Sequence, residues 1–392
     1  MKTISISLLS LHFFLAALAS AQWIPQTSPL PINDTTSDVP GKIQFVSPTE
    51  GWIGMSSARL LHTVDAGANW VVVDPDPVDT AGFFSNPTGS ISFTDSQHGW
   101  AIGTLYNSGG AVLYKTVNGG SSWNRQVLTP WIWGAGVQFL DSSIGWIGVI
   151  GANFATAAIL RTVDGGVNWI PGQTFSQKIV KPFFVDANNG WAYTDSITNN
   201  ISSPSEILHT TDGGANWTTQ LRDTTPGELL DIHFSDLNHG WVTGRNDKVY
   251  KTNNGGANWT RVTNMGQDAT AKHSAVFFVD SNNGWISGKI PGNGNNAVLH
   301  TTNGGTSWTI DLSNTQYDVF SLFFVDANSG WLAADYGAIA HYTSGVGIFG
   351  KGPNHFTNRQ TRNRVELRNL NGRRYSADNK IKFDKIFGWP SP

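Results

Sequence analysis

The sequence contains no cysteine and little charge, since Asp, Glu, Lys and Arg make up only 14% of its 392 residues. Without cysteine there is no disulfide framework, no thiolate-bound metal and no cysteine nucleophile. A helical bundle would carry far more Glu, Lys and Ala. Long apolar runs are also missing after residue 19, and none reaches the roughly 20 residues that a membrane-spanning helix needs. The sequence therefore predicts no transmembrane segment in the mature chain.

Glycine and tryptophan, in contrast, are abundant, with 43 and 17 residues. Ser, Thr and Asn are also frequent, which suits turns and exposed strand faces. This composition predicts many short strands joined by tight turns. The length permits one large domain or two ordinary ones.

The N-terminus has the features of an export signal. Lys2 is followed by an apolar run over 4–19, and Ala19-Ser20-Ala21 matches a small-x-small cleavage site. We predict a signal peptide at 1–21 that is cleaved near Ala21, and a secreted, periplasmic or cell-surface protein. The alternative interpretation is an N-terminal membrane anchor.

A Gly-Trp pair recurs along the chain every 44 to 50 residues. Each pair follows a segment of alternating apolar residues, such as IQFVSPTEGW at 43–52. The pattern predicts a strand, a polar turn and a second strand that opens with the tryptophan. The seven tryptophans are Trp52, Trp100, Trp146, Trp191, Trp241, Trp285 and Trp331.

A second motif follows the first six pairs by 11 to 19 residues and reads, for example, TVDAGANW at 63–70. This is the Asp-box pattern, in which the Asp or Asn accepts backbone N–H groups inside the turn. The glycine adopts a positive φ, and the tryptophan opens the next strand and is expected to be buried between sheets. The acidic or amide position is Asp65, Asn118, Asp164, Asp212, Asn254 and Asn303.

Each unit therefore supplies four strands, which is one blade of a propeller. The last unit lacks an Asp box, and its fourth strand is expected at the other end of the chain, in QWIPQ at 22–26. We predict an all-β, seven-bladed propeller over 22–346 in which the N-terminal strand completes the last blade. Closing the ring in this way removes exposed sheet edges.

Asp boxes occur in sialidases, other glycoside hydrolases and sortilin-type receptors. The full unit, F-x-D-x-x-x-G-W followed by T-x-D-G-G-x-x-W, most resembles the photosystem II assembly and stability factor family and its secreted bacterial relatives. That resemblance implies a seven-bladed, non-catalytic scaffold that binds a protein partner.

An enzymatic alternative is a sialidase-like glycoside hydrolase, which needs an arginine cluster and paired acidic groups. Only Arg59, Arg222 and Arg245 lie outside repeated positions of the propeller, and Glu228 is one of its few glutamates. The box carboxylates are interpreted as structural, because Asn replaces Asp in three copies and cannot act as an acid. We therefore predict no catalytic residue, no metal and no cofactor.

Function is expected where the repeats differ. The connection between the second and third strands varies from 11 to 19 residues, and in propellers it usually shares one face with the blade-to-blade connections. Surplus aromatic residues on such loops suit recognition of proteins or glycans. The predicted binding residues on this face are Tyr106, Trp131, Trp133, Phe154, Arg245 and Tyr336, beside Asp247 and Asp335. We expect a monomer that binds a protein, with a glycan as the alternative and no nucleic acid.

Residues 347–392 break the repeat and contain ten Lys or Arg against three Asp or Glu. This asymmetry marks a separate basic tail. The segment VELRNLNGRRY at 365–375 could form a strand, a turn at Asn371-Gly372 and another strand. It resembles a C-terminal sorting domain, which implies export or anchoring at the cell surface. The other interpretation is a disordered basic tail.

Overall fold

The structure is a computed structural model, which divides into two compact units, one of them Ser20–Ser344. It describes residues 22–29, 39–56, 59–76, 90–105, 110–152, 156–176, 178–196, 204–263, 265, 271–289, 295–315, 317–344, 357–361, 364–368 and 374–375. The predicted signal peptide at 1–21 lies outside these residues.

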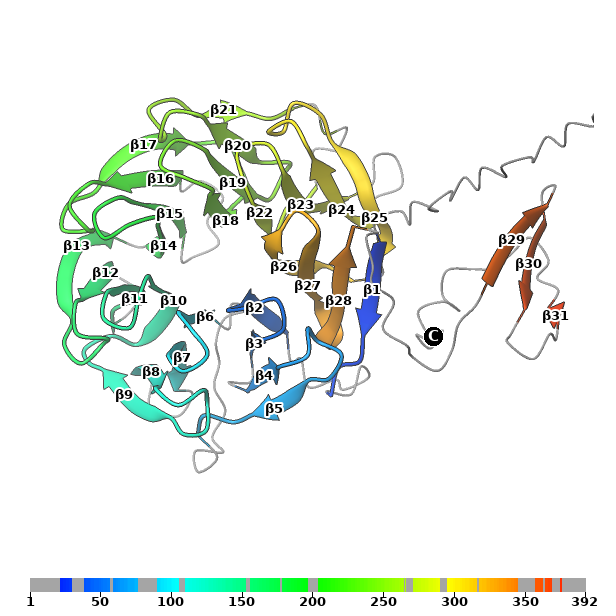
Figure 1. Ribbon diagram of the computed structural model, residues 1–392. Coiled ribbons are helices and arrows are strands. Elements are labelled where there is room, and N and C mark those ends of the chain that lie inside the picture. The colour runs from blue at the N-terminus through cyan, green and yellow to red at the C-terminus, as the bar shows by residue number, and fades with distance from the viewer. Residues whose placement is uncertain are drawn as a thin grey trace, which may run out of the picture. The chain divides into compact units, whose positions relative to one another are not determined.

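Seven four-stranded antiparallel sheets form a ring, as the sequence predicts (Figure 1). In each of the first six blades, four consecutive strands lie in chain order from the inside outward. The first four blades are β2 (Pro40–Phe45), β3 (Gly51–Met55), β4 (Leu60–Thr63) and β5 (Val71–Val73); β6 (Ser90–Phe93), β7 (Gly99–Leu105), β8 (Gly110–Thr116) and β9 (Asn124–Leu128); β10 (Trp133–Phe139), β11 (Gly145–Ile150), β12 (Thr156–Thr162) and β13 (Ile170–Ser176); and β14 (Lys178–Phe184), β15 (Gly190–Ser196), β16 (Ser205–Thr210) and β17 (Thr218–Asp223).

The seventh blade is closed by the N-terminal strand. Trp23 of β1 pairs with Tyr342 of β28, which confirms the predicted closure. The remaining blades are β18 (Leu229–Phe234), β19 (Gly240–Gly244), β20 (Val249–Thr252) and β21 (Thr260–Arg261); β22 (Val276–Phe278), β23 (Gly284–Lys289), β24 (Asn296–Thr301) and β25 (Thr309–Thr315); and β26 (Val319–Asp326), β27 (Ser329–Ala334), β28 (Ala338–Thr343) and β1 (Gln22–Gln26), with a short 3-10 turn η2 (Asp335–Gly337).

The core lies between neighbouring blades. Each Gly-Trp tryptophan is almost completely buried and stacks on the last phenylalanine of the next inner strand, with ring centroids 3.4–4.4 Å apart. The glycine before it is needed for this packing, because a Cβ on Gly51 would lie 2.5 Å from the Phe45 ring. The seven pairs are Trp52–Phe93, Trp100–Phe139, Trp146–Phe184, Trp191–Phe234, Trp241–Phe278, Trp285–Phe324 and Trp331–Phe45.

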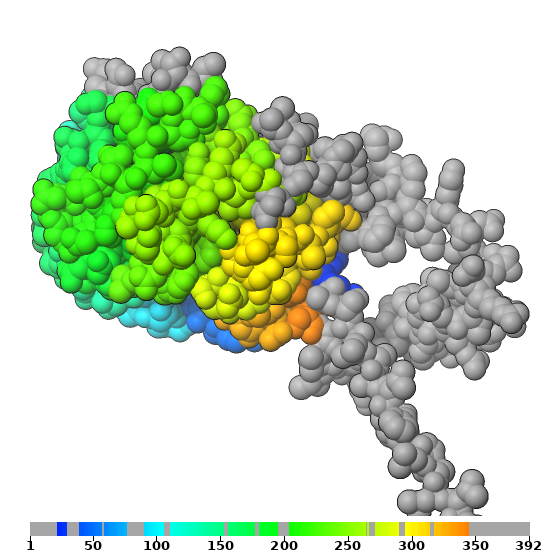
Figure 2. Space-filling view, turned by 90° about the horizontal axis from the view of Figure 1, so that it is seen from above, coloured from blue at the N-terminus to red at the C-terminus, as the bar shows by residue number. Residues whose placement is uncertain are grey.

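The box tryptophans contribute less to this core than the sequence suggests. Trp70 and Trp217 are buried, whereas Trp123 and Trp169 are only half-buried at the edge of it. They lie two strands further out, at the start of the fourth strand, where the space between radiating blades is wider. Figure 2 views the ring from its edge, where the outer strands of the middle blades meet solvent, and β13 accordingly has only half-buried and exposed residues.

Backbone hydrogen bonds define two faces of the ring. On one face each box turn bonds to the turn between the first two strands of its blade, as in Gly165 N to Ser143 O at 2.8 Å. On the other face the second-to-third-strand loops bond to the blade-to-blade connections, as in Arg245 N to Glu228 O at 2.8 Å. We call these the box face and the variable face.

The second compact unit contains a three-stranded antiparallel sheet of β29 (Thr357–Thr361), β30 (Arg364–Arg368) and β31 (Arg374–Tyr375). Leu367 pairs with Tyr375, so the predicted strand–turn–strand pattern at 365–375 is confirmed in its two strands. The turn at Asn371-Gly372 lies outside the described residues.

Candidate functional site

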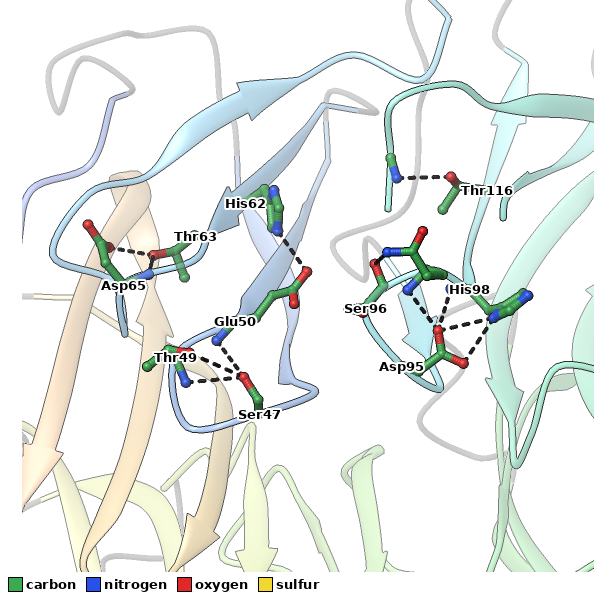
Figure 3. A network of polar contacts seen from close by, with 12 residues as sticks. Ser47, Thr49, Glu50, His62, Thr63, Asp65, Asp95, Ser96, His98 and Thr116 are labelled. Atoms are coloured by element: carbon green, nitrogen blue, oxygen red, sulfur yellow. Dashed lines mark hydrogen bonds and ion pairs between the residues drawn. The ribbon is translucent and has the colours of Figure 1, made fainter. Parts of the chain in front are cut away.

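The acidic groups of the box face hold turns. The Asp65 carboxylate accepts a hydrogen bond from Thr63 Oγ1 (2.9 Å), and Asp95 accepts one from His98 N (2.8 Å) (Figure 3). Asp65 also accepts a hydrogen bond from Asn69 N at 2.8 Å. Asn118 accepts the equivalent bond from Ser122 N at 3.0 Å. The side-chain oxygen of an amide and that of a carboxylate therefore accept the same backbone hydrogen bond in these turns.

These hydrogen bonds also fix the charge of the box carboxylates. A backbone hydrogen bond from Asn168 lowers the pKa of Asp164 to about 2, and one from Asn216 does the same for Asp212. A group with such a pKa stays ionised at neutral pH and is a poor general acid. The box face thus offers fixed negative charge but no poised proton donor among these groups.

Four of the predicted binding residues are described by the structure, and all four lie on the variable face. The fold does not bring them together, because they belong to different blades. Trp131 precedes and Trp133 begins the inner strand β10 of blade 3, whereas Arg245 belongs to blade 5 and Tyr336 to blade 7. Tyr106 and Phe154 lie outside the described residues.

The two surplus tryptophans pack locally. Trp131 is half-buried against the cluster between blades 2 and 3, and its carbonyl accepts a hydrogen bond from Ala111 N at 2.9 Å. Trp133 is half-buried against the cluster between blades 3 and 4. Both residues remain partly exposed, so each can anchor its loop and also contact a partner.

A polar network links blades 5, 6 and 7 on the same face. In blade 5, Arg245 Nε donates to Glu228 Oε2 at 3.0 Å. In the same loop, Asp247 Oδ1 lies 3.0 Å from Nε2 of His273 in blade 6. The other ring nitrogen of this buried histidine lies 2.8 Å from the Ser287 carbonyl oxygen. Both ring nitrogens thus lie at hydrogen-bond distance from oxygen atoms, and the side chain links blades 5 and 6.

The network continues into blade 7. Lys272 Nζ lies 3.1 Å from Asp318 Oδ2 and 4.7 Å from the centre of the Phe320 ring. Burial and then the neighbouring Asp318 carboxylate raise the pKa of Asp335. Positive and negative groups therefore alternate over three adjacent blades.

Tyr336 projects from the end of this network. Its side chain is 57% exposed, and its backbone has a left-handed φ of 58°. Its ring lies 5.2 Å from the Tyr317 ring. A non-glycine residue in this conformation is uncommon and is often found at functional loops. We call Arg245, Asp247, Lys272, Asp318 and Tyr336 the blade 5–7 sector.

Sequence reasoning found Arg245, Asp247 and Tyr336 but missed Lys272, Asp318 and Tyr317. The missed residues precede the inner strands β22 and β26, in connections that carry no repeat motif. Their place just before the I-x-F segment was the available signal, because a propeller brings all such connections to one face.

The three arginines considered for a sialidase-like site belong to three different blades. Arg59 precedes β4 in blade 1, Arg222 belongs to β17 in blade 4 and Arg245 to blade 5. Glu228 is bound to Arg245, and Arg222 Nη1 lies 3.8 Å from Glu206. Across the described ranges, no three His, Asp or Glu side chains are placed to hold a metal ion. Nor does any helix in them have the length and apolarity to span a membrane.

The family described as "Photosynthesis system II assembly factor YCF48" matches residues 15–169 and 220–347. The "Photosystem II assembly lipoprotein Ycf48" of Synechococcus sp. (strain CC9902) is 33% identical over 86 residues, which span 22% of this chain and 24% of that protein.

Two solved structures have the same fold and similar size. "YCF48 bound to D1 peptide" has a TM-score of 0.63 at 19% identity, covering 83% of this chain and 95% of the other. "YCF48 from Cyanidioschyzon merolae" has a TM-score of 0.62 at 18% sequence identity, covering 83% of this chain and 99% of the other. A third structure, a GH74 xyloglucanase from Xanthomonas campestris, has a TM-score of 0.60 at 12% sequence identity, covering 91% of this chain and 63% of the other. At these identities the likeness is one of fold.

Proposed function

From the premise that the chain belongs to the Photosynthesis system II assembly factor YCF48 family, we propose that it is an exported, non-catalytic propeller whose variable face binds a protein partner. The observation that carries this proposal is Tyr336, an exposed tyrosine in a left-handed backbone conformation. Tyrosine and arginine are enriched among residues that dominate binding energy at protein interfaces.

The partner is proposed to be an extended or loop segment with both polar and apolar side chains. Alternating charges at Arg245, Asp247, Lys272 and Asp318 give electrostatic specificity. Tyr336, Trp131 and Trp133 supply apolar surface with few rotatable bonds. A relative solved with a D1 peptide makes a peptide of that kind the first candidate to test.

The non-catalytic character rests on the carboxylates. Those of the box face are committed to turns, and Glu228 and Asp318 are paired with cations. Because GH74 enzymes share the fold, the full chain should also be incubated with xyloglucan. Release of reducing ends would refute this part of the proposal.

Binding is tested by fluorescence anisotropy with a labelled D1 peptide and a scrambled peptide. We expect the native peptide alone to bind, and the double variant R245A/Y336A to weaken it about tenfold or more. Val64→Ser, which alters a 66% exposed box-face residue, is the matched control. Equal binding by wild type and R245A/Y336A would place the interface elsewhere, and no difference between the two peptides would argue against a photosystem partner.

Export and the tail are part of the same proposal. We propose that 1–21 is removed on export, that 22–346 is the propeller and that 347–392 is a basic tail that aids sorting or surface attachment. N-terminal sequencing of the mature protein checks the first point. Fractionation of cells that express the chain with and without 347–392 checks the third, because retention at the surface should then depend on the tail.

A further inference from the structure

The exposed apolar side chains of the ring gather on three of its blades. Of the twelve large apolar residues that are exposed in the described part of the chain, eight belong to the box turns or outer strands of blades 1 to 3. Single apolar residues on a protein surface are ordinary, whereas a group of them on one side marks an interaction site. The eight are Val64, Val71, Val72, Val117, Val127, Val163, Val167 and Ile170.

Four of these residues lie in the box turns, and we call them the valine patch. Val64, Val117 and Val163 directly follow the box threonine of blades 1, 2 and 3, and they are 66, 58 and 53% exposed. Val167, later in the third box, is 65% exposed. Blades 4 to 6 have polar residues after the box threonine, namely Thr211, Asn253 and Thr302.

The box turn itself does not require a valine. Valine and threonine share a branched shape and a similar preference for extended backbone. In blade 4, where Thr211 stands in place of the valine, Thr210 Oγ1 donates to Asp212 at 2.8 Å. In blade 3, Thr162 Oγ1 donates to Asp164 at the same distance. The valine therefore adds apolar surface without changing the turn.

Contacts between blades place the three boxes next to one another. The box of blade 2 lies against blade 1, because a Cβ on Gly120 would be 2.5 Å from the Trp52 ring. Lys115, two residues before Val117, extends from blade 2 to the box of blade 3, where its Nζ would be 2.7 Å from a Cβ on Gly165. The valine patch is thus carried by one continuous part of the box face.

Aspartates with permanent charge stand beside the valines. Asp65 and Asp164 directly follow Val64 and Val163 in the sequence, and both are exposed. The Asn69 side chain donates to Asp65 at 2.7 Å and lowers the pKa of that carboxyl. Since the pKa of Asp164 is also lowered, to about 2, both groups carry a negative charge at neutral pH.

Little positive charge opposes these carboxylates at the surface. The box turns and the first turns of blades 1 to 3 cover 47–50, 63–70, 94–98, 116–123, 140–144 and 162–169, and they contain four Asp and one Glu but neither Lys nor Arg. The cations of the strands that lead into the boxes are half-buried. Lys115 Nζ lies 5.7 Å from the centre of the Trp100 ring, and Arg161 Cζ lies 5.9 Å from that of Trp146.

We propose that the valine patch and the aspartates beside it bind a basic segment of another protein, in which Lys or Arg residues alternate with aliphatic ones. The aliphatic side chains cover the valines, and the cations lie at Asp65 and Asp164. A second copy of this face would place carboxylates opposite carboxylates, and an anionic lipid surface would be repelled. The surface belongs to the box face, so it is independent of the partner surface proposed on the variable face.

The test uses the full chain and three fluorescently labelled octapeptides, in which lysine alternates with valine, lysine with threonine, or glutamate with valine. Fluorescence anisotropy should show that the lysine–valine peptide binds about tenfold more tightly than the other two, and that added salt weakens it. Equal binding of the lysine–threonine peptide would overturn the role of the valines. Equal binding of the glutamate–valine peptide would overturn that of the carboxylates, and no binding of the lysine–valine peptide would refute the proposal.

The other blades supply conservative variants for the valines. Val64→Thr, Val117→Thr and Val163→Thr together copy the boxes of blades 4 and 6, so the ring should fold as before and the lysine–valine peptide should bind about tenfold more weakly. Ile310→Thr makes the same exchange at a 48% exposed position of β25 in blade 6 and is the matched control. Equal affinity of the triple variant and wild type would refute the role of the patch.

The carboxylates are tested in the same way. Asp65→Asn with Asp164→Asn copies the boxes that have asparagine, such as that of Asn118, and should weaken the lysine–valine peptide and reduce its salt dependence. The variant R245A/Y336A should bind this peptide as wild type does, which separates the two proposed surfaces.

Two results would assign the valine patch to another occupant and overturn the proposal. One is binding to phosphatidylglycerol or phosphatidylcholine vesicles that the triple valine variant loses. The other is a dimer in analytical ultracentrifugation that the same variant abolishes.

Discussion

Gln44 of blade 1 exchanges two hydrogen bonds with the backbone of Phe93 in blade 2. Its Nε2 donates to the Phe93 carbonyl at 2.8 Å, and its Oε1 accepts from the Phe93 N–H at 2.9 Å. Gln138 makes the same pair of bonds with Phe184, at 2.8 and 2.6 Å. A side chain thus replaces the backbone ladder that two neighbouring blades cannot form.

Removing this clamp should destabilise the ring. Gln44→Ala leaves a buried donor and acceptor unpaired, so we expect the free energy of unfolding to fall by about 2 kcal/mol. Chemical denaturation of the full chain measures it. Gln97→Ala, in an exposed turn, is the matched control. A loss of the same size in both variants would show that the interblade bonds are not responsible.

The glycine of the Gly-Trp pair should tolerate no side chain. A Cβ on Gly51 would lie 2.5 Å from the Phe45 ring, which itself stacks on Trp331 at 3.5 Å. Relief requires moving a ring that is packed on both sides, so Gly51→Ala should cost about 3 kcal/mol or more.

Thermal unfolding of Gly51→Ala checks this expectation against Gly136→Ala. At Gly136 the nearest atom to a new Cβ is 3.8 Å away, which is an ordinary contact. That variant should stay within about 1 kcal/mol of wild type. If Gly51→Ala is equally mild, the close packing of Phe45 on Gly51 is not essential.

The ring was predictable because each blade repeats the same local chemistry. Every Gly-Trp pair needs the same phenylalanine above its glycine, and every box turn uses an Asp or Asn at the same offset, so the motifs remain in register. The last unit lacks an Asp box and a fourth strand, and the segment around Trp23 resembles the missing strand. Together they imply that the N-terminal strand closes the ring, which the pairing of Trp23 with Tyr342 confirms.

The functional surface was less predictable because its contacts join different blades. The pair of Lys272 and Asp318 spans two connections without a motif, and that of Asp247 and His273 depends on a turn with φ values of 58° and 56°. Trp131 fits no position of the repeat, but its half-burial depends on where two blades meet.

Asp231 should make stability depend on pH in a characteristic direction. Its pKa is raised by burial to about 6, from 3.8. Because the unfolded chain releases this proton more readily, the ionised group costs stability above pH 6, by about 3 kcal/mol at most, and nothing below pH 3.8. The carboxylates with lowered pKa, such as Asp164, have the opposite effect, which is lost as the pH falls toward 2.

Comparing wild type with Asp231→Asn isolates that contribution. The amide still offers an oxygen to Val276 N but cannot ionise, so the variant should be more stable at pH 7.5 and equal to wild type near pH 4. Denaturation midpoints at a series of pH values measure the difference. A constant difference across the range would mean that Asp231 does not titrate near pH 6.

The ion pair of Lys248 and Asp223 gives the largest expected loss. The Lys248 side chain is completely buried, and its Nζ lies 2.8 Å from Asp223 Oδ2 and 2.7 Å from the Thr225 carbonyl oxygen. Tyr250 OH also donates to Asp223 at 2.7 Å. Burial alone would raise the pKa of Asp223, but the hydrogen bonds from Lys248, Thr225 and Tyr250 lower it to about 2.

Lys248→Met removes the cation and leaves this carboxylate buried beside a methyl group. Breaking one partner of a buried pair costs about 3–5 kcal/mol, so the variant should unfold far below the wild-type midpoint. Lys248→Met combined with Asp223→Asn removes the unpaired charge and should recover part of the loss. A double-mutant cycle by chemical denaturation measures the coupling, and strictly additive losses would contradict it. Because Lys248 follows Asp247 in the loop that carries Arg245, partial recovery of stability without recovery of peptide binding would show that this ion pair also positions the blade 5–7 sector.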